Sequence, residues 1–258
     1  MINKIKKIIS KKNKTKIICL TAYSKNFASE VDKYADITLV GDSLGSVLYN
    51  YNTTRKVTLD NMIEHSKSVR MGIKKSLMVV DMPYKTYQNK KEALKNAIKI
   101  IQQTKCDAVK LEGGSKIKEI IKHLVRNNLP VMGHIGILPQ SVKGQFKYKG
   151  RAKKEKKQLL NDAKILQNLG VFSIVLECVE SGTAKLITKS IRIPTIGIGS
   201  SKYCDGQVLV TDDLLGLNQT NTRFVKKFIN LRKIISQGIR KFKKEVISKK
   251  YPSKKYSY

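Results

Sequence analysis

The chain has few of the residues that usually separate one domain from the next. It contains only five prolines in 258 residues, and no stretch rich in proline, glycine and serine that would serve as a linker. A chain of this length makes either one large domain or two small ones. We therefore expect a single domain over residues 1–258, with a flexible basic N-terminus at about 1–14 and a tail at about 249–258.

Cysteine is scarce and its pattern excludes a cysteine metal site. The four cysteines lie in or beside apolar runs and form neither a CxxC pair nor any other metal-ligand spacing (Cys19, Cys106, Cys178 and Cys204). Cysteines beside apolar runs are typically buried free thiols of proteins in a reducing compartment. The N-terminal segment also lacks the apolar core of a secretory signal, so a cytoplasmic protein is expected.

Long apolar runs and arginine are both scarce. No stretch of 18 apolar residues exists, so no membrane span is predicted. The net charge is +33, yet only eight of the 52 basic residues are arginine. Nucleic-acid surfaces favour arginine because its guanidinium group binds in a bidentate manner. The scattered lysines instead indicate solvated helix faces, with no specific nucleic-acid partner, and a positive field that attracts anionic substrates.

Short runs of valine, isoleucine and leucine alternate with helical patterns along the chain. The runs predict eight strands, at residues 16–23, 37–43, 76–83, 107–114, 130–136, 172–179, 193–200 and 207–214. Apolar stripes at helical spacing predict helices at 91–105, 115–128 and 154–170. Eight units of about 32 residues match a closed (β/α)8 TIM barrel of ~250 residues. The open doubly wound alternative would show a GxGxxG turn after its first strand, and none is present there.

An amphipathic helix is predicted after the last strand, over residues 222–248, with Gly238 as the point at which it would break. It would form a C-terminal helical extension of the barrel. A basic amphipathic helix is able to bind membranes, but packing on the barrel or on another subunit is the favoured interpretation for a chain with no other membrane signal.

Acidic residues end four of the predicted strands. These are Asp42, Asp81, Glu112 and Glu177, and a fifth strand ends in the motif that holds His134. Ligands of α/β barrels bind at the C-terminal ends of the strands. Four carboxylates at one rim are costly unless they share a cation or a proton. The pattern therefore predicts a metal site with an acid/base residue beside it.

Three of these carboxylates follow consecutive strands. Asp42, Asp81 and Glu112 bring only oxygen ligands, which suit a hard cation such as Mg²⁺. The alternative is that each caps a helix or pairs with a lysine. Lys110 lies two residues before Glu112 and shares its face of the strand. It would hold a substrate carboxylate, or else form an ordinary salt bridge at the rim.

The remaining polar candidates have two interpretations each. Ser43 offers a hydroxyl and an N–H group to an anion, although alone it is a weak signal. His134 would donate to a developing oxyanion or satisfy a buried carbonyl. Glu177, expected across the barrel from the metal cluster, would be a general base or a partner in a rim salt bridge.

Several motifs together resemble the ketopantoate hydroxymethyltransferase family. They are DSLG at 42–45, KLEGG at 110–114, GHIGILPQS at 133–141 and LECV at 176–179, and the resemblance covers roughly residues 15–252. It implies a barrel assembled into a homodecamer. It also implies transfer of a hydroxymethyl group from 5,10-methylenetetrahydrofolate to 3-methyl-2-oxobutanoate, which gives 2-dehydropantoate in pantothenate (coenzyme A precursor) biosynthesis.

The same resemblance implies roles for individual residues. It assigns Mg²⁺ to Asp42, Asp81 and Glu112, and proton removal to Glu177. Contact with the oxo acid is assigned to Asp42, Ser43, Asp81 and Lys110, with His134 close by.

The chain departs from the family pattern in three places. Ser24 replaces the usual acid of a TAYD motif, and the segments 50–58 and 142–149 diverge, the latter in a loop expected near the folate. The nearest alternative function is another Mg²⁺-dependent barrel that makes or breaks C–C bonds in 2-oxo acids, of the phosphoenolpyruvate mutase/isocitrate lyase group. Members of that group carry a KKCGH-like loop, which this sequence lacks.

Overall fold

Eight parallel strands close into a ring in the computed structural model, which describes residues 2–141, 148–219 and 222–258. The strands are β1 Ile17–Thr21, β2 Ile37–Val40, β3 Leu77–Asp81, β4 Ala108–Glu112, β5 Val131–Gly136, β6 Ser173–Glu177, β7 Thr195–Ile198 and β8 Gly206–Leu209. Each strand pairs with the next along the chain, and β8 pairs with β1. The structure thus confirms the predicted (β/α)8 barrel.

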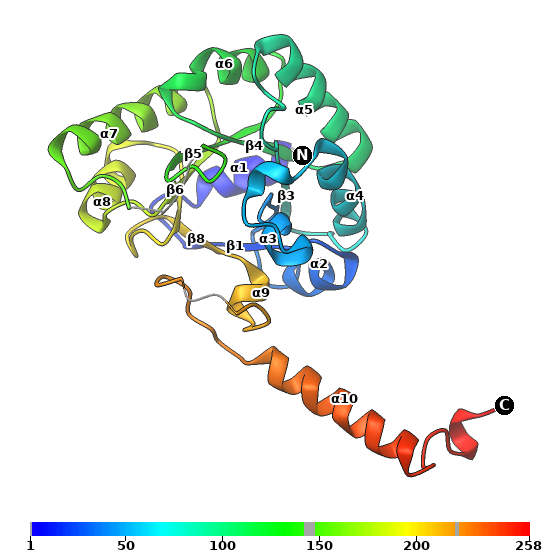
Figure 1. The fold of residues 1–258 in the computed structure, drawn as a ribbon. Coiled ribbons are helices and arrows are strands. Elements are labelled where there is room, and N and C mark those ends of the chain that lie inside the picture. The colour runs from blue at the N-terminus through cyan, green and yellow to red at the C-terminus, as the bar shows by residue number, and fades with distance from the viewer. Residues whose placement is uncertain (1, 142–147, 220–221) are drawn as a thin grey trace. The chain divides into compact units, whose positions relative to one another are not determined.

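Helices lie on the outside of this ring (Figure 1). They are α2 Lys25–Val31, α3 Leu44–Tyr49, α4 Leu59–Arg70, α5 Lys90–Thr104, α6 Lys118–Arg126, α7 Lys153–Asn168 and α8 Ser181–Ser190. Two short 3-10 helices, η1 Thr54–Lys56 and η2 Ser115–Ile117, complete the connections. The predicted helices at 91–105, 115–128 and 154–170 correspond to α5, to η2 with α6, and to α7.

Strand alternation decides which side chains enter the barrel. On β3, Leu77 and Val79 belong to the inner cluster of apolar residues, whereas Met78 and Val80 pack outward against the helices. Asp81 is the next inward position after Val79. The alternation therefore carries a carboxylate to the C-terminal mouth of the barrel, and the same reasoning applies to the inward positions of β4.

The opposite end of the barrel is closed by a helix that the sequence patterns do not predict. Helix α1 spans Ile2–Ser10, within the segment expected to be flexible. Its Ile8 is 3% exposed and packs with Ile17 and Ile37 inside the barrel. The ammonium group of Lys4 donates to the carbonyl of Ser76 at 2.8 Å. The expected flexible N-terminus is therefore corrected to a helix that docks on the barrel.

The chain divides into two compact units, residues 1–210 and 211–258. The barrel lies in the first, and the single domain expected over 1–258 stays a prediction. The second unit holds α9 Thr211–Leu214, α10 Leu231–Ile247 and η3 Lys254–Tyr256.

Two predicted boundaries are corrected in the second unit. The strand predicted over 207–214 ends at Leu209, and its last residues form α9. The helix predicted over 222–248 begins only at Leu231 and continues through Gly238. Asn230 sets this start because its Oδ1 accepts a hydrogen bond from the backbone N–H of Lys233 at 3.1 Å.

The structure also bears on the state of the cysteines and on membrane spans. The four cysteines are unpaired; Cys19, Cys106 and Cys204 are buried and Cys178 is half-buried. Across the described ranges, the helices all fall short of the length and apolarity that a membrane span requires.

Candidate active site

Five polar side chains meet at the C-terminal mouth of the barrel. They are Asp42, Asp81, Lys110, Glu112 and His134, and all are buried. The strand register places them side by side: Asp81 lies opposite Lys110, and Glu112 lies opposite His134. The residues chosen from the strand ends are thus neighbours in space.

Lys110 is the cation of this cluster. Its Nζ lies 3.1 Å from Asp81 Oδ1. Burial lowers the pKa of Lys110, but the carboxylates of Asp81 and Glu112 outweigh burial, and the net pKa is raised above its ordinary value. Lys110 is therefore protonated at neutral pH, and the salt bridge expected as its alternative role is present.

His134 is neutral and has a defined tautomer. Burial and the charge of Lys110 lower the pKa of its imidazole. Its Nδ1 lies 3.3 Å from Lys110 Nζ, and a protonated lysine only donates, so Nδ1 accepts. The ring proton is then on Nε2, which lies 3.2 Å from Glu177 Oε2, although the two atoms are not aligned as a hydrogen bond.

Glu177 lies closer to the cluster than the sequence suggests. It was expected across the barrel from the carboxylates, but only β5 separates its strand from β4, and His134 stands between the two. Nδ1 of His134 is 3.6 Å from Glu112 Oε1, on the side away from Glu177. The Glu177 side chain is 19% exposed, against 2% for His134 and 3% for Glu112, so it is more open to a substrate than these neighbours.

Asp42 and Glu112 both have raised pKa values because they are buried near other carboxylates. Burial, and then the carboxylate of Asp81, raise the pKa of Asp42 to about 7. Burial and the charge of Asp42 raise the pKa of Glu112 well above its ordinary value. The cluster thus favours binding a proton or a cation, as the sequence pattern predicts.

A divalent cation fits this cluster by charge and by donor type. Asp42, Asp81 and Glu112 supply only oxygen atoms, and Lys110 alone does not balance their charge. Within the described ranges, no three acidic, histidine or cysteine side chains form a ready metal-binding group. Binding would therefore require small rotations of these carboxylates towards the ion.

Three site residues were not identified from the sequence. Gln140 donates to Asp42 and to Glu112, and Tyr87 donates to Gln140. Tyr23 shares a hydrogen bond of 2.9 Å with Ser43, which follows Asp42. The signal for Gln140 is the PQS triplet two residues after the GHIG motif, where a buried polar residue follows a strand that ends in the site.

The structure describes part of the segments in which the chain departs from the family pattern. Ser24 precedes α2, and its side chain forms no capping hydrogen bond. Arg55 donates to the hydroxyl of Tyr84 at 2.9 Å and stacks over its ring. Of the predicted folate loop at 142–149, residues 142–147 lie outside the described residues, and Lys149 donates to the carbonyl of Cys178 at 2.9 Å.

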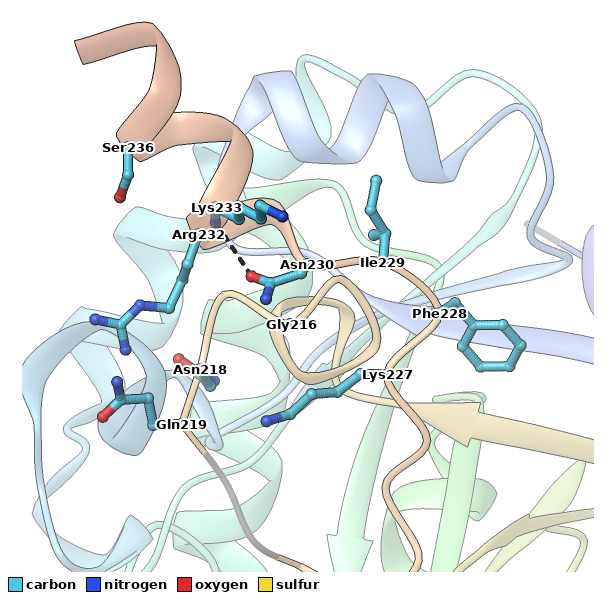
Figure 2. Close-up of a pocket in the computed structure, with 10 residues that line it drawn as sticks. All are labelled: Gly216, Asn218, Gln219, Lys227, Phe228, Ile229, Asn230, Arg232, Lys233 and Ser236. Atoms are coloured by element: carbon cyan, nitrogen blue, oxygen red, sulfur yellow. Dashed lines mark hydrogen bonds between the residues drawn. The ribbon is translucent and has the colours of Figure 1, made fainter. Parts of the chain in front are cut away.

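Two cavities are lined by residues other than those of this cluster. One of about 670 Å³ lies in the second unit, and Figure 2 shows its lining, which includes Lys227, Arg232 and Lys233 and no acidic residue. It lacks both cation ligands and a general base. The other, of about 210 Å³, is lined by residues of α1 and of the segments that precede β2 and β3. The mouth of the barrel is therefore the candidate site on chemical grounds.

Comparison with known proteins gives a consistent result. A family model described as ketopantoate hydroxymethyltransferase matches residues 2–254. A Pelagibacter ubique protein named 3-methyl-2-oxobutanoate hydroxymethyltransferase is 64% identical over 258 residues, 100% of both chains. A Rhizobium etli protein of the same name is 45% identical and covers 94% of this chain and 90% of its own.

Solved structures share the fold at low identity. A phosphonopyruvate hydrolase in complex with oxalate and Mg²⁺ gives a TM-score of 0.66 at 8% identity, over 98% of this chain and 93% of that one. A 2,3-dimethylmalate lyase gives 0.55 at 10% identity, over 75% and 71%. These likenesses establish the barrel alone.

Proposed function

Because the chain belongs to the ketopantoate hydroxymethyltransferase family, and is thus a hydroxymethyltransferase of pantothenate biosynthesis, we propose that it requires Mg²⁺ and uses 5,10-methylenetetrahydrofolate as its one-carbon donor. The acceptor is 3-methyl-2-oxobutanoate. The observation that carries the proposal is the line of contacts from Asp81 through Lys110 and His134 to Glu177.

Asp42, Asp81 and Glu112 would hold the metal ion. Their crowding raises the pKa values of Asp42 and Glu112, and this penalty is relieved when a cation shares the charge. When bound, Mg²⁺ acts as a Lewis acid that stabilises negative charge on the oxygen atoms of a 2-oxo acid.

Lys110 and Ser43 bind the carboxylate end of the oxo acid. Lys110 is protonated, and a buried ammonium group attracts a carboxylate strongly at this depth. The Ser43 hydroxyl, held by Tyr23, adds a hydrogen-bonding group beside Asp42. Together they orient the acid so that its branched carbon faces the open side of the mouth.

Glu177 is the general base. It removes the proton from the carbon that carries the two methyl groups, and the electron pair of that C–H bond forms the enolate. His134 holds its Nε2 proton 3.2 Å from Glu177 Oε2, next to the carboxylate that takes the substrate proton. Water adds its oxygen to the one-carbon unit and its two hydrogens to the two folate nitrogens as both carbon–nitrogen bonds break, which releases tetrahydrofolate and leaves the carbon at the oxidation level of formaldehyde. The enolate carbon attacks this carbon, and the resulting alkoxide takes the proton held by Glu177 to give the hydroxymethyl group.

The test is a reconstituted reaction. Purified protein is incubated with Mg²⁺, 5,10-methylenetetrahydrofolate and 3-methyl-2-oxobutanoate, and 2-dehydropantoate is detected by mass. Product that disappears with EDTA and returns with added Mg²⁺ supports the proposal. Product that is insensitive to EDTA would remove the metal from it. The alternative lyase or mutase activity has no support from the relatives, which carry the transferase name.

The assembly and location follow from the same resemblance. We infer a homodecamer in the cytoplasm; the unpaired thiols support the second point because such residues persist in reducing compartments. Light scattering after gel filtration should give the mass of ten 29.2 kDa chains. The mass of a single chain would contradict the assembly.

A further inference from the structure

Gln140 lies inside the carboxylate cluster, yet none of the roles proposed above uses it. It follows β5 by a short loop and is buried. Its side chain reaches across the mouth to the segments that follow β2 and β3. Nε2 donates to Asp42 Oδ2 at 2.8 Å and to the carbonyl of Met82 at 3.0 Å. Its backbone N–H donates to Glu112 Oε2 at 3.0 Å.

The orientation of the Gln140 amide is fixed by its partners. The carbonyl of Met82 only accepts, so the NH₂ group of Gln140 must face it and Asp42. On the other side, the hydroxyl of Tyr87 donates to Gln140 Oε1. Both amide hydrogens and the amide oxygen therefore have partners, and the side chain has one stable position.

The consequence is that Gln140 occupies one oxygen of each of two carboxylates. It binds Oδ2 of Asp42 and Oε2 of Glu112, while Asp42 Oδ1 and Glu112 Oε1 take no part in these bonds. A carboxylate with one oxygen engaged in this way is poorly placed to grip a cation with both. Mg²⁺ accepts single oxygens in a tight octahedron, whereas Ca²⁺ takes more ligands and often both oxygens of a carboxylate.

We propose that Gln140, held by Tyr87, is a positioning residue that makes Asp42 and Glu112 offer one oxygen each and so favours Mg²⁺ over Ca²⁺. The inference rests on the proposed metal site and adds a reason for that site to select Mg²⁺ over Ca²⁺. Residues that hydrogen-bond to metal ligands commonly orient those ligands. Loss of such a residue costs roughly 10- to 100-fold in metal affinity.

The experiment measures cation binding directly, without turnover. Isothermal titration of the purified full-length protein gives the Kd of Mg²⁺ and of Ca²⁺ for the wild type, Gln140→Ala and Tyr87→Phe. Gln102→Ala is the matched control because Gln102 is an exposed glutamine of α5. Circular dichroism without metal establishes that each variant is folded.

Gln140→Ala removes the side-chain bond to Asp42 and leaves the backbone bond to Glu112 in place. We expect it to lose Mg²⁺ affinity by roughly 10- to 100-fold and Ca²⁺ affinity by much less, so that the ratio of the two falls. Tyr87→Phe should shift the ratio in the same direction by roughly 2- to 10-fold, the effect of one hydrogen bond. The control should match the wild type. Should Gln140→Ala not fold, Tyr87→Phe decides the question because it removes one oxygen and keeps the ring.

The failures are distinguishable. A wild type that binds neither cation overturns the proposed metal site itself. A wild type that binds Mg²⁺, together with variants whose Mg²⁺ to Ca²⁺ ratio is unchanged, overturns only the role of Gln140. An equal loss for both cations also overturns it, because a merely supporting residue would weaken both alike.

Discussion

At the scale of single residues, Asp81 connects the proposed metal ligands with the proposed substrate-binding lysine. Its Oδ2 accepts from the backbone N–H of Asp42 at 3.1 Å, while Oδ1 pairs with Lys110. We expect Asp81→Ala to lose roughly 10³-fold or more in turnover, because charge stabilisation by a metal ion contributes several kcal/mol. Asp60→Ala, at an exposed ion pair with Lys99, is the control. Full activity of the Asp81 variant in Mg²⁺ would refute the assignment.

Glu177→Gln tests the general base separately from the metal. The variant keeps the size of the side chain and leaves the three proposed ligands in place. The rate should fall by roughly 10²- to 10⁴-fold because proton removal is lost. The Kd for Mg²⁺, measured by titration, should stay near that of the wild type. A near-normal rate would mean that another group removes the proton.

The neighbouring thiol reports on the charge of Glu177. Burial, and then the carboxylate of Glu177, raise the pKa of Cys178 to about 12. The reactive species is the thiolate, so Glu177→Gln should lower this pKa and speed alkylation of Cys178 by iodoacetamide at pH 8.5, by roughly 2- to 10-fold. Mass spectrometry locates the label, and the Cys178→Ser variant provides its blank. An unchanged rate would contradict an effect of the Glu177 carboxylate on the reactivity of the thiol.

The sequence predicts those site residues whose side chains follow from strand alternation. Asp81 and Lys110 are at inward positions of β3 and β4, and a period of two fixes that face without knowledge of the rest. Gln140 and Tyr87 lie in loops, where no periodicity determines the path of the backbone. Their positions in the site depend on how the ends of neighbouring strands are arranged, and that arrangement exists only in the assembled barrel.

At the scale of elements, α1 makes a stability contribution that is separate from catalysis. Ile8 fills the end of the barrel opposite the site and is 3% exposed, whereas Ile2 on the same helix is 66% exposed. Ile8→Ala should lower the free energy of unfolding by about 2–5 kcal/mol, and Ile2→Ala by less than about 0.5 kcal/mol. Urea unfolding measures both. Equal stabilities of the two variants would contradict the docking of α1.

Elements were predictable where an apolar pattern is continuous. The strands before the site carry runs of valine, isoleucine and leucine, so their existence and order were clear from the sequence. Helix α1 was missed because lysines separate its few apolar residues, of which Ile8 is buried and Ile5 packs against the same inner cluster. The reverse error occurs at 222–230, where apolar residues continue the helical pattern but the cap at Asn230 starts the helix later.

At the scale of the whole molecule, the net charge of +33 should act on substrate capture. Both the oxo acid and the folate are anions, and a positive field raises their encounter rate. We expect kcat/KM to fall as NaCl rises from 0.05 to 0.5 M, and more steeply for a pentaglutamyl folate than for the monoglutamate. If kcat/KM depended equally on NaCl for the two folates, the salt would act on the reaction at the barrel mouth and not on capture of the folate. Glycerol at matched viscosity is the control for slowed diffusion.

The pairing of β1 with β8 also bears on how the enzyme is made. These two strands close the ring, with Ile17 opposite Gly206. Ribosomes deliver the chain from its N-terminus, so every strand that carries a proposed site residue emerges before β8 does. Until then the nascent protein exposes two unpaired strand edges, which are templates for aggregation. The last strand, which carries no proposed site residue, thus covers both exposed edges when it pairs with β1 and β7.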